Sequence, residues 1–176
     1  MNDPEAARRR EVIVRMSEFC ECAERAPAVR VNEASAEIDV LCRPRDESMS
    51  CFTLAIEIKA HTRVGDRELG RWIKQASDYV GATPRNGWPS VAASFVWLVG
   101  VDLHPSVEEQ LRMDGMLQLA QHFRVGHARE TPVGLTLLFG PSKCLYRRKR
   151  EGWTPRSLEW LGAKRISGGT RKPLPH

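Results

Sequence analysis

The sequence predicts an α/β protein whose mixed central sheet is flanked by helices on both faces. Apolar residues recur at helical spacing near the N-terminus and again over residues 69–80. Short apolar runs with strand-like alternation lie between these segments and after the second one. The expected order is a helix, three strands, a helix and a strand, which packs as layers of helices against a sheet.

The first helix is expected over residues 3–27, followed by a short strand over 28–31. The apolar positions that support this helix are Val12, Ile13, Met16, Phe19, Cys20 and Ala23. On such a helix Cys20 and Cys22 would project about 200° apart, from the period of 3.6 residues per turn. No second Cys/His pair accompanies them, so a structural zinc site is not expected.

The next two strands, 37–41 and 52–59, carry charged side chains among apolar ones. Side chains alternate between the two faces of a strand, so Glu57 and Lys59 point the same way. Asp39 on the preceding strand would join them if the two strands pair. Isolated buried charges are costly, and such clusters commonly hold a metal ion or perform chemistry.

The remaining elements follow the same criteria of apolar period and of Gly or Pro at the ends. They are a helix over 69–80, a strand over 91–101, a helix over 107–123, a strand over 133–139 and a strand or hairpin over 143–153.

A chain of 176 residues and 19.9 kDa is expected to form one domain with extensions. We divide it into a core with an accessory helix and strand over 1–142, a basic strand or hairpin over 143–165, and a disordered tail over 166–176.

The positive charge is concentrated at the C-terminus. From Lys143 onward there are ten Lys/Arg against two Asp/Glu, whereas residues 1–142 carry a net charge of −3. This asymmetry indicates a polyanionic partner, and nucleic acid is the commonest one. A solvated tail that only maintains solubility is the alternative. The basic run that would bind a phosphate backbone is Arg147, Arg148, Lys149 and Arg150.

The chain has no apolar run of membrane-spanning length and no signal peptide at its N-terminus. Its five cysteines lack the dense spacing of a disulfide scaffold. We therefore expect a cytoplasmic protein of a bacterium or archaeon, or of a phage or virus in its host, without a membrane partner.

Asp39 and the tripeptide Glu57-Ile58-Lys59 resemble the acidic residues and the lysine of the PD-(D/E)XK nuclease superfamily. The resemblance covers about residues 3–102. It implies a restriction-endonuclease-like core of αβββαβ order, in which the first acid lies on the second strand and the tripeptide on the third. The family often has Pro before the first acid, whereas this chain has Ile38.

The second helix adds two further points of resemblance. Gln75 and Tyr79 are similar to a Gln-x-x-x-Tyr motif of the exonuclease and helicase-nuclease branch, and as an i,i+4 pair they share one side of the helix. The resemblance implies a catalytic role for Gln75 and nucleic-acid binding by Tyr79, with the pair directed toward phosphate or a metal-bound water. Residues 64–73 look like the corresponding helix of archaeal Holliday-junction resolvases, which are compact, basic and usually dimeric. The alternative is that Tyr79 is a core residue and Gln75 a surface residue.

The resemblance implies a site for Mg²⁺, which Mn²⁺ can replace, because phosphodiester hydrolysis needs an activated water and charge neutralisation. Asp39 and Glu57 would bind the ion together with the main-chain carbonyl of Ile58. Lys59 would favour the ionised form of the attacking water. Without a metal, Asp39, Glu57 and Lys59 would form an ion-pair network at the sheet rim.

Resolvase-like members also carry a metal-supporting glutamate on the first helix. Glu5 is the best match in this chain, because it lies about 20° from Met16 on the helical wheel.

We expect a magnesium-dependent DNA endonuclease that acts on branched or structured DNA in repair, recombination or phage metabolism. The alternatives are an exonuclease or restriction-type endonuclease of the same fold, a non-catalytic DNA-binding or regulatory module, and an interaction subunit of a larger complex. A homodimer would allow both strands of a junction to be cut, because one site cuts one strand.

Overall fold

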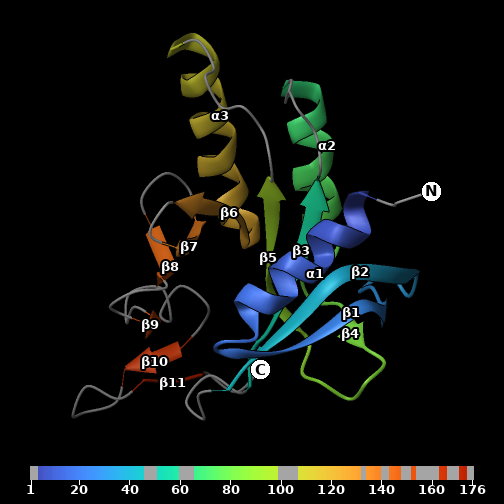
Figure 1. Cartoon of the computed structure of the whole chain (residues 1–176). Coiled ribbons are helices and arrows are strands. Elements are labelled where there is room, and N and C mark those ends of the chain that lie inside the picture. The colour runs from blue at the N-terminus through green and yellow to red at the C-terminus, as the bar shows by residue number, and fades with distance from the viewer. Residues whose placement is uncertain are drawn as a thin grey trace.

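The structure is a computed structural model, and its described residues form a large mixed β-sheet, three α-helices and a separate two-stranded sheet (Figure 1). The residues described are 4–45, 51–59, 66–98, 107–131, 134–139, 143–147, 152–153, 163–165 and 171–173. The helices are α1 (Pro4–Met16), α2 (Asp66–Ser77) and α3 (Val107–Ala120), which continues into the 3₁₀ turn η2 (Gln121–Phe123). Among the described residues, none of these helices has the length and apolar character needed to cross a membrane.

Within the described residues, nine strands form one sheet in the order β4-β1-β2-β3-β5-β6-β7-β8-β9. They are β1 (Cys20–Val29), β2 (Ser35–Pro44), β3 (Thr53–Lys59), β4 (Thr83–Pro84), β5 (Val91–Leu98), β6 (Val125–Thr131), β7 (Gly134–Phe139), β8 (Lys143–Arg147) and β9 (Gly152–Trp153). Strands β3, β5 and β6 run parallel to one another, and the other neighbours are antiparallel. Helix α2 lies in the connection from β3 to β5 and α3 in the connection from β5 to β6, as parallel neighbours require.

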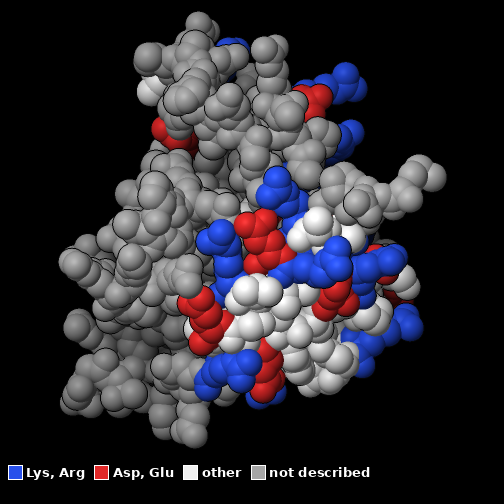
Figure 2. Space-filling view, in the orientation of Figure 1, with Lys and Arg blue, Asp and Glu red and all other residues white. Residues whose placement is uncertain are grey.

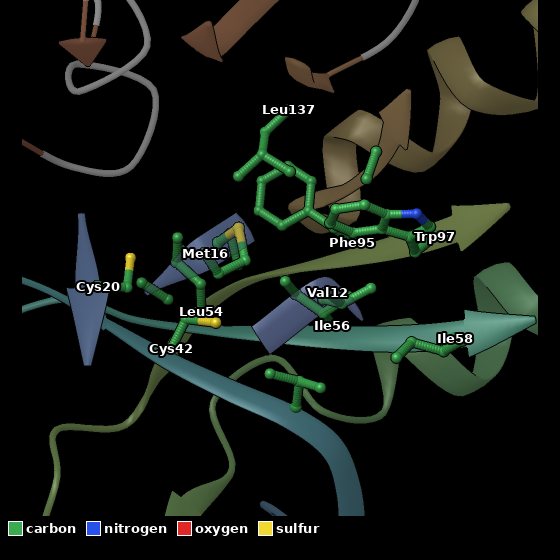
Figure 3. Close-up of a cluster of buried hydrophobic side chains, with 14 of the residues drawn as sticks. Val12, Met16, Cys20, Cys42, Leu54, Ile56, Ile58, Phe95, Trp97 and Leu137 are labelled. Carbon is green, nitrogen blue, oxygen red and sulfur yellow. The ribbon is translucent and has the colours of Figure 1, made fainter. Parts of the chain in front are cut away.

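The helices cover both faces of the sheet. Helix α1 packs on one face, where Val12 and Met16 meet apolar residues of β2, β3 and β5 (Figure 3). Helices α2 and α3 pack on the other face, where Trp72 and Met113 share a cluster with Val96 of β5. The expected α/β class, and the expected order of helix, three strands, helix and strand, are therefore confirmed.

The boundary between the first helix and the first strand was predicted wrongly. Helix α1 ends at Met16 instead of near residue 27, and Cys20–Val29 is the long strand β1. This strand pairs with β2 from Cys20 opposite Pro44 to Val29 opposite Ser35. Buried and exposed residues do not alternate cleanly along β1, so the sequence shows no clear strand pattern here. The apolar residues 19, 20 and 23 fit a helical period by coincidence, and pairing with β2 favours the strand.

Strand β6 was not predicted, because it carries polar and charged residues between its few apolar ones. It nevertheless lies inside the sheet, between β5 and β7. The hairpin expected over 143–153 is present as the antiparallel pair of β8 and β9.

The C-terminal segment differs in part from its prediction. Residues 166–176 were expected to be disordered, but Arg171–Pro173 forms strand β11 and pairs with β10 (Ala163–Arg165). The other residues of 166–176 lie outside the described part of the chain.

Gly126 of β6 tests the packing of the sheet interior. A Cβ atom here would clash with the carbonyl oxygen of Leu138 and lie 2.6 Å from the ring of Phe95. We expect Gly126→Ala to lower the free energy of unfolding by about 1–3 kcal/mol, the range for overpacking a close-packed core. Urea denaturation monitored by circular dichroism measures this change.

Gly115→Ala in α3 is the matched control. An added Cβ meets no described atom within 4 Å, so the variant should be about 0.5–1 kcal/mol more stable through helix propensity. A Gly126→Ala protein as stable as the native protein would contradict the close approach of β6 to its neighbours.

Candidate metal and catalytic site

Asp39 and Glu57 meet at the point where β2 and β3 separate. The antiparallel pairing of these strands ends at Val40 opposite Ile56. The next residues in the same register are Asp39 and Glu57, but no main-chain pair joins them there. Instead, the N–H of Ile58 donates a hydrogen bond to Oδ2 of Asp39 at 2.9 Å. The Asp39 side chain therefore takes the place of a backbone acceptor where the sheet opens.

The other edge of β2 is interrupted at the same residue. The pairing of β1 with β2 passes from Glu24 opposite Val40 to Ala26 opposite Ile38, and Arg25 is not paired with Asp39. Arg25 has a φ of 48°, in the left-handed region, which costs a non-glycine residue about 1–2 kcal/mol. Asp39 thus lies at a break in the pairing of β1 with β2, and the break is accompanied by strained backbone at Arg25.

Glu57 is the buried carboxylate of the site, with only 2% of its surface exposed. Burial is the main cause that raises the pKa of Glu57, and the negative charge of Asp39 raises this pKa further. Lys59 and Tyr79 oppose the shift in pKa. The ammonium of Lys59 donates to Oε1 of Glu57, and the hydroxyl of Tyr79 donates to Oε2 at 2.9 Å. Each oxygen of the buried carboxylate therefore has a donor.

Tyr79 and Gln75 act together on Glu57. Gln75 Nε2 donates to the hydroxyl oxygen of Tyr79 at 3.1 Å, and this hydroxyl also lies 3.3 Å from the main-chain oxygen of Glu37. Burial and the negative charge of Glu57 raise the pKa of Tyr79, so the hydroxyl stays protonated and remains a donor. Tyr79 is only 2% exposed and offers little surface to a nucleic acid, the role predicted for it. Its contacts suit the orientation of Glu57 instead.

Arg9 is a member of the site that the sequence analysis missed. This α1 residue is 8% exposed, donates from Nε to Oε1 of Glu24 at 3.1 Å, and places Nη1 3.9 Å from Oδ1 of Asp39. A signal was present, because Arg9 precedes Val12 and Met16 by three and seven residues and so lies on the apolar stripe of the helix. A buried cation on such a stripe needs a carboxylate partner.

The other predicted residues are not all brought to this point. Glu5 is exposed in the first turn of α1, one turn before Arg9, and its metal-supporting role stays a prediction. Arg147 lies in β8, which β5, β6 and β7 separate from β3 within the sheet. The rest of that basic run, residues 148–150, lies outside the described part of the chain.

The oxygen donors fit a small, hard cation. Over the described residues, no group of three or more His, Cys, Asp or Glu side chains is arranged to hold a metal ion. Asp39 and Glu57 are a pair of carboxylates whose mutual repulsion raises the pKa of Glu57, and a cation between them would relieve it. Mg²⁺ or Mn²⁺ needs only one or two carboxylates, because water completes its coordination. The main-chain carbonyl of Ile58 is a further candidate ligand.

No family model, curated protein or solved structure gives a significant match to this chain. The resemblance to PD-(D/E)XK nucleases therefore rests on Asp39, Glu57 and Lys59 and on the order of the elements that carry them.

The charge of Asp39 should be measurable at Glu57. Asp39→Asn removes the negative charge but keeps an oxygen for the Ile58 N–H, so we expect the pKa of Glu57 to fall. NMR titration of the Glu57 carboxyl carbon without divalent cations measures this pKa. The pKa of Glu57 is higher in the folded protein than in the unfolded chain. The free energy of unfolding therefore falls as the pH rises above the pKa of Glu57 in the unfolded chain. Asp39→Asn should reduce that loss.

Glu37→Gln is the matched control, because Glu37 pairs with Arg25 on the surface and does not contribute to the pKa of Glu57. Its Glu57 pKa should equal that of the native protein. An unchanged pKa in Asp39→Asn would contradict the coupling of the two carboxylates.

Proposed function

We propose that this protein is a metal-dependent DNA nuclease with a restriction-endonuclease-like αβββαβ core of the PD-(D/E)XK type. The observation that carries the proposal is the convergence of Asp39, Glu57 and Lys59 where β2 and β3 separate. The chain order α1, β1, β2, β3, α2, β5, interrupted by the two-residue strand β4 after α2, and the hydrogen bond from Tyr79 to Glu57 support it.

The site residues meet the needs of phosphodiester hydrolysis. Asp39 and Glu57 would hold Mg²⁺, which supplies positive charge beside the phosphate and lowers the pKa of water. Lys59 is held at the same place by its ion pair with Glu57. Its ammonium would stabilise the ionised form of the attacking water and orient it toward phosphorus.

The surrounding residues hold the two acids in position. Tyr79 fixes one oxygen of Glu57, and Gln75 in turn fixes the hydroxyl of Tyr79. The Ile58 N–H and Arg9 act on the two oxygens of Asp39. Such supporting contacts matter because ligand carboxylates must be oriented before an ion binds.

We propose DNA as the polyanionic partner, with branched or structured DNA as the preferred form, and the cytoplasm as the place of action. Basic and acidic side chains are mixed over the described part of the face that carries α1 (Figure 2). The surplus of positive charge lies in residues 143–176. Contacts from such a segment to the phosphate backbone would bind DNA without reading its sequence. A homodimer remains part of this proposal.

A second candidate is a non-catalytic DNA-binding module of the same fold. One observation favours it, because Lys59 pairs with Glu57 and Arg9 lies beside Asp39, so each carboxylate has a protein cation. Such a network is balanced without a metal ion. Metal binding and cleavage separate the two candidates.

Cleavage is the direct test of the nuclease. With Mg²⁺ or Mn²⁺, the protein should cut at least one member of a panel of labelled linear, nicked, flapped and four-way DNAs. Lys59→Ala should lower the cleavage rate about 10²–10⁴-fold, the usual contribution of proton-transfer groups, while DNA binding persists. Gel assays measure the rate, and fluorescence anisotropy measures binding.

Lys74→Ala is the control for loss of a lysine, because the Lys74 side chain is 75% exposed on α2 and pairs with Asp78. It should retain cleavage. Robust cleavage by both Asp39→Ala and Glu57→Ala would reject the assigned site.

Metal binding should also stabilise the folded protein. At 100 times its dissociation constant, a bound ion adds about 2.7 kcal/mol to the free energy of unfolding. We expect Mn²⁺ to raise the melting temperature of the native protein and of Glu37→Gln, but not of Asp39→Asn. If calorimetric titration shows no binding of Mn²⁺ to the native protein, the non-catalytic module is the better candidate.

A further inference from the structure

Three cysteines, Cys20 and Cys22 of β1 and Cys42 of β2, lie on the face of the sheet that α1 covers. Cys22 and Cys42 are directly opposite one another in the strand pairing, and their sulfur atoms lie 3.7 Å apart. Cys20 and Cys42 are fully buried in the core cluster on the α1 face (Figure 3). Cys22 is partly buried and packs against that cluster. None of these thiols takes part in the proposed nuclease site.

We propose that Cys22 and Cys42 are a redox-active thiol pair, which a low-molecular-weight disulfide such as glutathione disulfide oxidises to an intramolecular disulfide. The Cys22 thiolate attacks one sulfur of glutathione disulfide, and one glutathione thiolate leaves. Cys42 then gives up its proton, and its sulfur attacks Sγ of Cys22 and releases the second glutathione. The protein loses two electrons and two protons, and glutathione disulfide gains them.

The strand geometry permits this bond. Directly opposite residues of an antiparallel pair have Cα atoms about 4.5–5.5 Å apart. A disulfide requires a Cα separation of about 4.4–6.8 Å. The sulfur atoms of Cys22 and Cys42 are already in van der Waals contact. Side-chain rotation, without a shift of either strand, therefore suffices to close the bond.

The surroundings of the two thiols assign a different step to each. Cys22 is partly exposed, and hydrogen bonds from Cys42 and Ser17, together with the positive charge of Arg45, lower the pKa of Cys22. Burial raises the pKa of Cys42. Arg45 is held near this cluster by a hydrogen bond from its Nε to the main-chain oxygen of Cys20 at 3.3 Å. An accessible thiolate attacks first, so Cys22 is the attacking residue and Cys42 the resolving one.

Cys51 provides an internal comparison. It is exposed, but desolvation raises the pKa of its thiol. Exposure alone predicts that Cys51 reacts before Cys22, whereas the thiol cluster predicts the reverse. The bond would tie β1 to β2 three residues from Asp39, but its formation does not depend on the proposed nuclease activity.

Peptide mapping tests the proposal. The reduced full-length protein is freed of reductant, incubated with glutathione disulfide, and treated with N-ethylmaleimide in denaturant. Digestion with trypsin and with a protease that cuts after glutamate separates Cys20 from Cys22, because Glu21 lies between them. Mass spectrometry should find a peptide containing Cys22 linked to a peptide containing Cys42.

Two variants sharpen the assignment. Cys42→Ala should lose the linked peptides and leave glutathione on Cys22, whereas Cys51→Ser should form the link as the native protein does. Cys42 lies in the core, so Cys42→Ala can impair folding. The peptide map of the native protein tests the proposal without this variant. A link from Cys20 to Cys42, or modification that leaves Cys22 and Cys42 as free thiols, would overturn the proposal.

Discussion

The buried carboxylate of Glu57 is the constraint on which the rest of the site depends. An ionised group in the middle of a sheet loses its hydration, which costs several kcal/mol unless other groups replace it. Lys59 and Tyr79 supply donors to its two oxygens, and Gln75 holds Tyr79. Tyr79 stands two residues beyond the end of α2, so the apolar packing of α2 against the sheet brings its hydroxyl to Glu57.

A second carboxylate, Asp39, lies beside the first and changes its electrostatics. Asp39 occupies a break on both edges of β2, next to strained backbone at Arg25. Its negative charge works against the ionisation of Glu57. Paired carboxylates with a raised pKa occur at cation sites and also in structural ion-pair networks. Arg9 lies beside Asp39, and Lys59 pairs with Glu57, so each carboxylate already has a cation from the protein. A measurement of metal binding therefore distinguishes the nuclease from the non-catalytic module.

Several features of the fold could be predicted because their signals are local. The period of two in β3 placed Glu57 and Lys59 on one face, and the i,i+4 spacing joined Gln75 to Tyr79. Helix α3 with its 3₁₀ turn ends at Phe123, as predicted. Strand β6 was missed, because polar residues in a sheet interior depend on neighbours that the local pattern does not contain. Residues 19–23 were assigned to a helix for a related reason, since a short apolar spacing fits two periods.

The sequence by itself determined which side chains close in the chain share a face: Glu57 with Lys59, Gln75 with Tyr79, and Arg9 with Met16. Only the tertiary structure decided which faces meet. The opposition of Cys22 to Cys42, the contact of Arg9 with Asp39, and the hydrogen bond from Tyr79 to Glu57 join elements far apart in the chain. Backbone geometry sets the local period, but strand register and helix packing depend on burial summed over the whole core.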